Sequence, residues 1–370
     1  MSRPLVGTVT PPGSKSESNR ALMIAAYGRF PLEVDGLSDA HDTVLLKQLL
    51  ESTSSTVDCE DAGTVARFLM TYLAGKPGTW LLTGTDRLCE RPMAPLIDAL
   101  RQLGANITEN QLPLKIVAVP LKGGSVTLDA SLSSQFASSL LLAAPTWERG
   151  LQLTLTGRQV SMPYLEMTIK MMEHFGIQVV RKDNQITVAP QPYHPCPFKV
   201  SADWSAASYW YEMLAVTERG GDLLLKGLGP DSLQGDAVVV EWFKPFGIQT
   251  TFEAEGARII KTAAPVSQRF VFDFTNHPDL FPAVYATCFA LGVDAEFRGT
   301  ETLSGKESDR FKALKTELSK NPPVYHAYGD HRIAMALASL WPKLGPIAVD
   351  DPTVVGKSYP SFWKELNGFF

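Results

Sequence analysis

SKSESNRALMIAAYG, residues 14–28, decides the fold, because five further stretches of the chain follow its pattern. In each copy a small or polar turn opens a helix rich in alanine and other small apolar residues. Ser, Asp and Gly at such openings are typical of helix N-caps. The other copies begin at Asp61, Ser131, Asp203, His277 and Gly329. A recurring segment of this kind predicts six related α/β units.

Five of the copies are followed by a second, amphipathic helix, and the sixth by a short C-terminal candidate. In RPMAPLIDALRQLGAN, for example, Leu96, Leu100 and Leu103 fall at helical spacing. Short alternating or apolar strands such as LQLTLTG and RFVFDF lie between the helices. We therefore predict an α/β fold in which each of two domains contains three units. Ordinary α/β alternation without a repeat remains the alternative.

Two of the intervals between successive copies are shorter than the others. They are the interval between the first two copies and the one before the last copy. Strands are therefore expected to be missing or shortened near residues 51–60 and 319–325.

Length and composition exclude several classes of protein. The chain has 370 residues, of which 45% are hydrophobic and 20% charged, as in folded globular proteins of two domains. The net charge of −5 gives no reason to expect a nucleic acid or an anionic membrane as partner. Neither a signal peptide nor a membrane span is recognisable, so we expect a cytoplasmic protein. The four cysteines lack zinc-ligand spacing, so free thiols and no metal are expected.

Three helix openings carry groups that bind anions. A helix N-terminus presents unpaired N–H groups and a partial positive charge. A serine-rich opening alone is usually only a cap, but three in one chain indicate binding of phosphates or carboxylates. The groups are Lys15, Ser16 and Arg20 in the first opening, Gly63 in the second, and Ser133, Ser134 and Gln135 in the third.

A second concentration of charge lies in the C-terminal third of the chain. In KESDR, Lys306 and Arg310 are like charges four residues apart, which repel on a helix unless an anion lies between them. The alternative is a solvated, charged helix start. With the other cations they form a set suited to two multiply charged anions. The set consists of Lys15, Arg20, Arg91, Lys306, Arg310, Arg332 and Lys357.

Acid–base chemistry needs groups other than arginine. The candidates are Asp279 in HPDL, Glu307 in KESDR and His331 in GDHR. For Asp279 a helix-cap role remains open as the alternative.

The chain resembles the 5-enolpyruvylshikimate-3-phosphate synthase family in an ordered set of motifs that spans essentially its whole length. These motifs are PGSKSESNRAL, DAGTVARFL, ERPMAPLIDALRQLGA, SSQFASSLLLAAP, SMPYLEMT, SLQGD, KESDR, GDHRIAMA and GKSYPSFW. The resemblance implies a two-domain inside-out α/β barrel, with three βαβαββ-type units per domain and two hinge crossings. The domains would be residues 1–12 plus 202–370 and residues 13–201.

The resemblance also implies an activity, in which the enolpyruvyl group of phosphoenolpyruvate is transferred to the 5-hydroxyl of shikimate 3-phosphate. Phosphate is released by addition–elimination as the domains close over both substrates. No cofactor is implied. The chain would be a monomer, and glyphosate would bind in the phosphoenolpyruvate site.

Site residues follow from the resemblance motif by motif. The catalytic groups would be Asp279, Glu307, Lys15, Lys357 and His331. Shikimate 3-phosphate would be bound by Lys15, Ser16, Arg20, Ser133, Ser134, Gln135, Ser161, Tyr164, Asp279, Thr302 and Lys306. Phosphoenolpyruvate would be bound by Lys15, Gly63, Arg91, Gln135, Arg310, Arg332 and Lys357.

Five positions depart from the family pattern. Asp61 and Thr302 stand where asparagine is common, and Phe68 stands where proline is frequent. Ser304 and Gly305 stand before KESDR where an arginine and a branched residue are usual. Two alternatives to this function remain. The first is the related transferase that acts on a UDP-sugar, whose reactive cysteine this chain does not obviously supply. The second is a non-catalytic anion-binding relative with the same fold.

Overall fold

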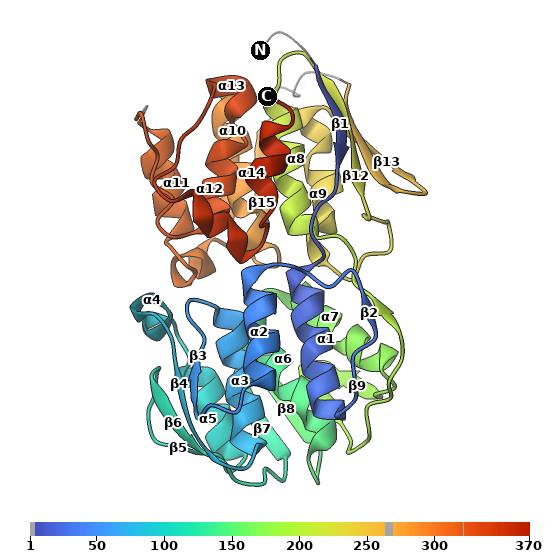
Figure 1. Cartoon of the computed structure of the whole chain (residues 1–370), viewed down its shortest axis with the longest axis vertical. Coiled ribbons are helices and arrows are strands. Elements are labelled where there is room, and N and C mark those ends of the chain that lie inside the picture. The colour runs from blue at the N-terminus through green and yellow to red at the C-terminus, as the bar shows by residue number, and fades with distance from the viewer. Residues whose placement is uncertain (1–3, 263–268, 321) are drawn as a thin grey trace. The chain divides into compact units, whose positions relative to one another are not determined.

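The computed structural model describes residues 4–262, 269–320 and 322–370. The chain divides into two compact units (Figure 1). Unit 1 contains Met1–Lys15, Ser38–His41 and Val200–Phe370, and unit 2 contains Ser16–Leu37 and Asp42–Lys199. Lys15 therefore belongs to unit 1 and not to the domain of residues 13–201 that the resemblance implies.

Three four-stranded sheets share one topology. In each sheet the first two strands along the chain pair in parallel, and the third and fourth form an antiparallel hairpin. The fourth strand pairs with the second, so the order across the sheet is first, second, fourth, third. The sheet of unit 1 is β1 (Leu5–Val9), β12 (Gly221–Lys226), β14 (Gly256–Lys261) and β13 (Ile248–Glu253). Unit 2 contains two such sheets. The first is β3 (Thr56–Asp58), β4 (Thr79–Thr83), β6 (Leu114–Val117) and β5 (Asn106–Ile107). The second is β7 (Gly124–Asp129), β8 (Leu151–Thr156), β10 (Gln185–Val188) and β9 (Val179–Lys182).

The other three of the six repeats have fewer strands. They consist of the parallel pairs β2 (Val34–Asp35) with β11 (Phe198–Lys199) and β15 (Phe270–Asp273) with β16 (Ala295–Arg298), and of a parallel bridge between Tyr325 and Val349. In the interval near residues 51–60 the chain passes from α2 to the three-residue strand β3. Among the described residues near 319–325, only the Tyr325 bridge is present. The expected loss of strands in both intervals is confirmed.

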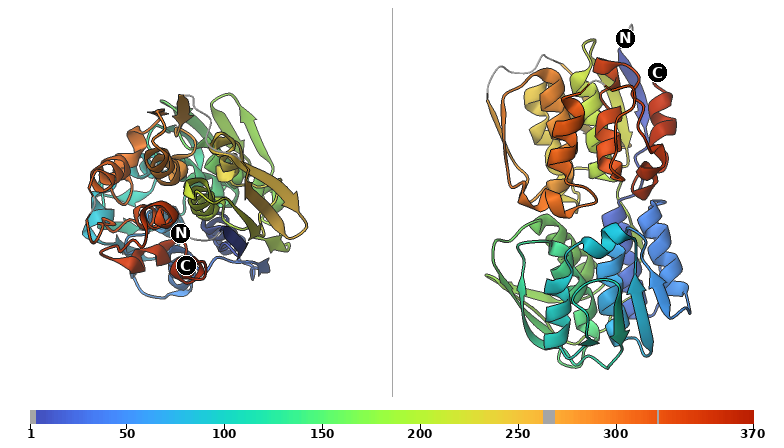
Figure 2. Two further views of the ribbon diagram at one scale, coloured as in Figure 1. Left: turned by 90° about the horizontal axis from the view of Figure 1, so that it is seen from above. Right: turned by 90° about the vertical axis from the view of Figure 1, so that its left-hand side faces the viewer.

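Each predicted repeat opening is followed by a helix. These helices are α1 (Lys15–Gly28), α3 (Gly63–Gly75), α6 (Ser134–Ala143), α8 (Trp204–Val216), α10 (Phe281–Leu291) and α12 (His331–Ala338). The second helices are α2 (His41–Glu51), α5 (Ala94–Gln102), α7 (Met162–His174), α11 (Arg310–Leu318) and α14 (Phe362–Asn367), and two short ones are α4 (Asp86–Glu90) and α13 (Trp341–Leu344). In unit 1 the helices lie alongside the four-stranded sheet (Figure 2).

The second helix expected in SLQGDAVVVEWFKPFGI is broken. It forms a 3₁₀ helix η2 (Gly235–Val238), one turn of α-helix α9 (Val239–Trp242) and a second 3₁₀ helix η3 (Lys244–Phe246). Pro245 lacks an N–H group and so cannot continue the α-helical ladder. Unit 1 also contains the 3₁₀ helices η4 (Pro278–Leu280), η5 (Glu301–Gly305) and η6 (Pro352–Lys357).

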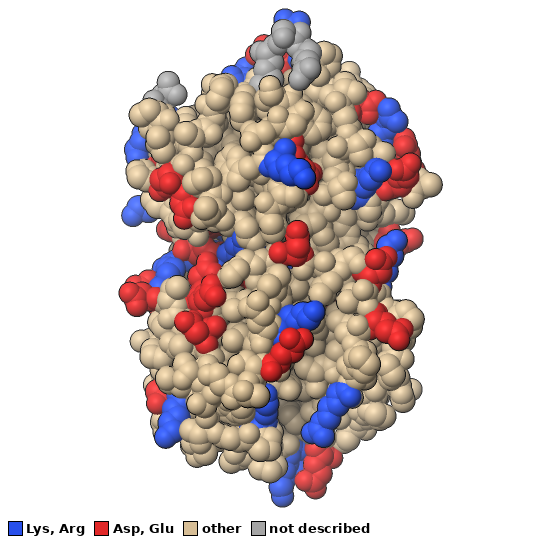
Figure 3. Space-filling model, viewed as in Figure 1, with Lys and Arg blue, Asp and Glu red and all other residues tan. Residues whose placement is uncertain are grey.

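On the face shown in Figure 3, acidic and basic side chains are intermixed. Within the described ranges, none of the helices has both the length and the apolar character needed to span a bilayer.

Glu212 lies in the core of unit 1, on helix α8, all of whose residues are buried. Neither carboxylate oxygen has a hydrogen-bond partner among the described residues, and burial raises the pKa of Glu212 well above its ordinary value. The folded state therefore keeps a proton that the unfolded state releases above about pH 4.5, so this group makes stability fall as pH rises. We expect the free energy of unfolding of Glu212→Gln to fall less steeply than that of the unsubstituted protein in urea titrations from pH 5 to 8. Equal slopes would contradict a buried, neutral Glu212.

Candidate active site

Arg310 is the centre of a buried polar cluster in unit 1. Its side chain is 1% exposed and donates hydrogen bonds to three carboxylates. Nε lies 2.9 Å from Asp330 Oδ2, Nη1 lies 2.8 Å from Asp279 Oδ1, and Nη2 lies 2.8 Å from Glu307 Oε2. Burial acts to lower the pKa of Arg310, but the three carboxylates outweigh it and raise the pKa above its ordinary value. Arg310 is therefore a permanent cation that holds three acidic groups together.

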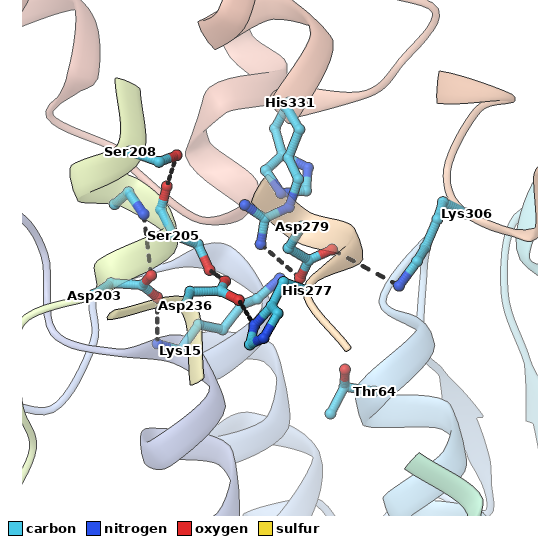
Figure 4. A network of polar contacts seen from close by, with 12 residues as sticks. Lys15, Thr64, Asp203, Ser205, Ser208, Asp236, His277, Asp279, Lys306 and His331 are labelled. Carbon is cyan, nitrogen blue, oxygen red and sulfur yellow. Dashed lines mark hydrogen bonds and ion pairs between the residues drawn. The ribbon is translucent and has the colours of Figure 1, made fainter. Parts of the chain in front are cut away.

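Asp279 is the acidic group with the most cations around it. Its Oδ1 accepts from Arg310 and lies 3.7 Å from Lys306 Nζ, and its Oδ2 accepts from Arg332 Nη2 at 2.9 Å (Figure 4). Burial acts to raise the pKa of Asp279, but the charges of Arg332, Lys306 and Arg310 hold it well below its ordinary value. The N-cap of η4 is His277. The alternative that Asp279 is only a helix cap is therefore wrong.

KESDR does not form the single helix start that the sequence suggested. Lys306 follows η5, and α11 begins only at Arg310. Its N-cap is Asp309, whose side chain accepts a bond from Lys312 N at 3.1 Å. The anion between Lys306 and Arg310 is the protein's own Asp279, so the like charges are compensated without a ligand.

Glu307 connects two cations. One carboxylate oxygen accepts from Arg310, and the other lies 3.9 Å from Lys357 Nζ. The side chains of Glu307 and Lys357 are 12% and 6% exposed. Because both groups exchange protons and neither is fully hydrated, the pair is suited to hold a proton next to a bound reactant.

Asp330 and His331 form the start of α12. Asp330 is the N-cap, with Oδ1 accepting from Arg332 N at 2.9 Å and Oδ2 accepting from Ser308 Oγ at 3.0 Å. His331 is 1% exposed. Burial and then the charges of Lys15 and Arg332 lower its pKa well below the ordinary value. His331 is therefore neutral at pH 7 and is not one of the fixed cations.

In unit 2, Arg20 binds three helices together. It lies on α1 and is 2% exposed. Its guanidinium donates to Thr168 Oγ1 at 2.7 Å, to the Ser16 carbonyl at 2.9 Å, to the Tyr164 carbonyl at 3.0 Å and to Ser138 Oγ at 3.4 Å. Burial lowers the pKa of Arg20 to about 10, so it stays protonated at pH 7.

Gln135 is the centre of a second polar group in unit 2. Its amide donates to Thr64 Oγ1 at 2.9 Å and accepts from Arg67 Nη1, and its backbone N–H donates to Ser133 Oγ, the N-cap of α6, at 3.2 Å. Arg67 is 3% exposed and was not identified from the sequence. The available signal was one charge in the apolar helix GTVARFLM, because an arginine there is buried only with polar partners.

Gly63 and Arg91 are in close contact. A Cβ atom added to Gly63 would lie 2.5 Å from Arg91 Nη1, which is closer than any real contact of this kind. Arg91 is 7% exposed and follows the short helix α4. The absence of a side chain at residue 63 therefore lets the guanidinium lie at the N-terminus of α3.

The other predicted residues are divided between the two units. Ser134 is the first residue of α6, Ser161 is the N-cap of α7 with a φ of 56°, and Tyr164 lies in the first turn of that helix, all in unit 2. Thr302 lies in η5 of unit 1, and its buried hydroxyl has no hydrogen-bond partner among the described residues. Unit 1 thus holds the acid–base candidates and most cations, and unit 2 holds the hydroxyl and amide donors.

Comparison with known proteins decides the family. The family model of EPSP synthase (3-phosphoshikimate 1-carboxyvinyltransferase) matches residues 45–322 and 320–366. The chain belongs to the EPSP synthase family. A 3-phosphoshikimate 1-carboxyvinyltransferase of Bacteroides fragilis is 40% identical over 97% of this chain and 94% of that protein. One of Syntrophobacter fumaroxidans is 33% identical over 95% and 94%.

The fold is that of solved EPSP synthases. A structure of EPSP synthase from Acinetobacter baumannii matches with a TM-score of 0.76 at 23% identity, and the match covers 99% of this chain and 96% of that one. The predicted α/β class and the two-domain inside-out barrel of the EPSP synthase family are confirmed at the level of the fold.

Proposed function

We propose that this chain transfers the enolpyruvyl group of phosphoenolpyruvate to the 5-hydroxyl of shikimate 3-phosphate and releases phosphate. The observation that carries the proposal is the cluster around Arg310. It combines fixed cations, which bind phosphate and carboxylate groups, with the carboxylates that proton transfer requires.

In the first half of this reaction a proton is added to the methylene carbon of phosphoenolpyruvate, and the hydroxyl oxygen bonds to the adjacent carbon. We assign the hydroxyl proton to Asp279, which is ionised before substrate binds because of its three cations. When anionic substrates engage Lys306 and Arg332, these charges are shared, and the affinity of Asp279 for a proton rises. Binding of the correct anions therefore makes Asp279 a stronger base.

In the second half the tetrahedral adduct loses a proton from the new methyl group and expels phosphate. We assign both proton transfers at this carbon to Glu307, assisted by Lys357, because their side chains face each other. Lys15 and His331 complete the proposed catalytic groups. The fixed cations stabilise the charge on the departing phosphate.

Substrate binding is divided by chemical type. We assign shikimate 3-phosphate to the short donors of unit 2, with Lys306, Thr302 and Asp279 from unit 1. The unit 2 residues are Ser16, Arg20, Ser133, Ser134, Gln135, Ser161 and Tyr164. Phosphoenolpyruvate is assigned to Lys15, Gly63, Arg91, Gln135, Arg310, Arg332 and Lys357. Arginine suits this substrate, because its planar fork binds a carboxylate or a phosphate with two hydrogen bonds.

Phosphate release measured with both substrates present tests the function. We expect release only when phosphoenolpyruvate and shikimate 3-phosphate are combined. Turnover with UDP-N-acetylglucosamine in place of shikimate 3-phosphate would instead favour the sugar-nucleotide transferase, and no release with either acceptor would favour a non-catalytic relative.

Gly63→Ala should raise KM for phosphoenolpyruvate about 10-fold or more with a smaller change in KM for shikimate 3-phosphate. The added methyl group overlaps the Arg91 guanidinium and forces this cation to move. We also propose that glyphosate, a small anion, competes with phosphoenolpyruvate and loses affinity in the same variant. Gly75→Ala is the matched control, because a Cβ there meets nothing within 4 Å. Unchanged kinetics in Gly63→Ala would contradict the role of Arg91.

We further propose a cytoplasmic monomer with two domains close to residues 1–12 plus 202–370 and residues 13–201; the compact units differ from these bounds at residues 13–15, 38–41 and 200–201. The support is the family and the division of the chain into two compact units. Light scattering during size-exclusion chromatography should give a mass near 40.5 kDa, and twice that value would indicate a dimer.

A further inference from the structure

The SLQGD segment, residues 232–236, has no place in the proposed reaction, yet it forms a buried polar network. Gln234 is 1% exposed and Asp236 is fully buried. The Gln234 amide donates to Asp203 Oδ1 at 3.0 Å and to Ser205 Oγ at 3.1 Å, and its carbonyl accepts from Trp204 N at 2.9 Å. All hydrogen-bonding groups of this side chain are therefore used.

Ser205 connects Gln234 to Asp236. The Ser205 hydroxyl accepts from Gln234 and donates to Asp236 Oδ2 (Figure 4). The second oxygen of Asp236 faces His277, with Oδ1 3.8 Å from Nδ1. At 3.8 Å this is an electrostatic contact and not a hydrogen bond.

His277 is also held by Trp242. The two rings meet edge to face, with centroids 5.5 Å apart, and Trp242 packs in the same way on Phe272 and Phe274 of the β15 segment. Asp236 and Trp242 belong to the consecutive elements η2 and α9. The broken second helix therefore places one polar and one aromatic contact on the same imidazole.

His277 leads directly to Asp279. It is the N-cap of η4, and its backbone N–H donates to the Phe274 carbonyl at 3.2 Å while its carbonyl accepts from Leu280 N at 3.1 Å. The His277 backbone is thus bound on both sides, and its ring is the point at which the network can hold this turn. Asp279 is the second residue of that turn.

We propose that Asp236 and His277 are positioning residues that hold η4 so that the Asp279 carboxylate stays aimed at its proton. The proposal rests on the assignment of Asp279 as the base. The rate of proton transfer depends on the position and orientation of the base, and a displacement of about 1 Å in a reacting group can lower the rate about 100-fold. The cations that contact Asp279 are not part of this network. Substitutions in the network should therefore change the affinity for the substrates little.

His277→Ala tests the proposal with the intact enzyme. We expect kcat to fall about 10- to 100-fold while KM for each substrate changes less than about 2-fold. His277→Asn should recover most of kcat, because its amide nitrogen takes the place of Nδ1. Asp236→Asn should resemble His277→Ala. The matched control is His326→Ala, since His326 also pairs with a carboxylate of unit 1, Asp350, at 2.9 Å but is 64% exposed.

A double-mutant cycle separates this proposal from the assignment of Asp279. If His277 acts through Asp279, adding His277→Ala to Asp279→Asn lowers kcat no further. Normal kcat in His277→Ala with an inactive Asp279→Asn would overturn the positioning role and leave the base in place. Normal kcat in Asp279→Asn would overturn the base and the positioning role with it. A loss in His277→Ala that asparagine does not recover, or a full additional loss in the double variant, would also overturn the proposal. If Asp236→Asn does not fold, the His277 variants decide alone.

Discussion

Asp279→Asn should lower kcat by about 10² to 10⁴, the range expected for loss of a general base. The amide is nearly the same size as the carboxylate but has no significant basicity, so it cannot take the hydroxyl proton. Phosphate release under saturating substrates measures kcat, and equilibrium binding of shikimate 3-phosphate shows that the site still forms.

The control for this substitution is Asp294→Asn, which removes a carboxylate whose side chain is 78% exposed. Its kcat should equal that of the unsubstituted protein. A fall of less than about 3-fold in Asp279→Asn would be too small for a base. The proton would then have to go to another group, and Glu307 is the next candidate.

Arg310→Met should destabilise unit 1 by about 3–5 kcal/mol and abolish turnover, because it leaves Asp279, Glu307 and Asp330 buried around an apolar side chain. The loss should be smaller at low pH. Removing the cation raises the pKa of Asp279, which Arg310 helps to hold low, so the folded variant takes up a proton more readily as pH falls. Urea titrations at pH 5 and pH 8 measure both effects.

Arg258→Met is the matched control for charge and size. Arg258 also binds two carboxylates, Asp222 at 2.6 Å and Glu253 at 3.5 Å, but its side chain is 42% exposed. Water replaces the lost contacts of an exposed pair, so stability should change little. Equal losses in the two variants would mean that burial of the Arg310 cluster is not what makes it important.

Much of the candidate site was predictable from local sequence. Helix openings such as that of α6 depend on a few neighbouring residues, and Ser133 caps this helix as an N-cap serine is expected to. Motifs also placed Asp279, Glu307 and Arg310 among the functional candidates. Arg67 was missed, because the sequence shows only that one charge lies in an apolar helix and does not show the Gln135 amide that it meets in space.

The meaning of the charges was not predictable in the same way. The like charges of Lys306 and Arg310 indicate a bound anion when only the sequence is considered, but the structure places Asp279 between them. Asp279 lies 31 residues before Arg310, at the opening of the first helix of the same repeat, so no local pattern could reveal the contact. The broken helix at residues 235–246 is a similar case, since its two contacts with His277 exist only after the units pack.

The recurring segment first seen at residues 14–28 determined by itself the number of units, the order of their helices and the places where strands are lost. Periodicity and capping are local properties, because they depend on residues that lie close together in the sequence. Only the tertiary structure decided which charges compensate one another, which groups are buried and therefore shifted in pKa, and which side chains hold Asp279. These depend on desolvation and on distances of a few ångström between residues far apart in sequence, and packing alone sets those distances.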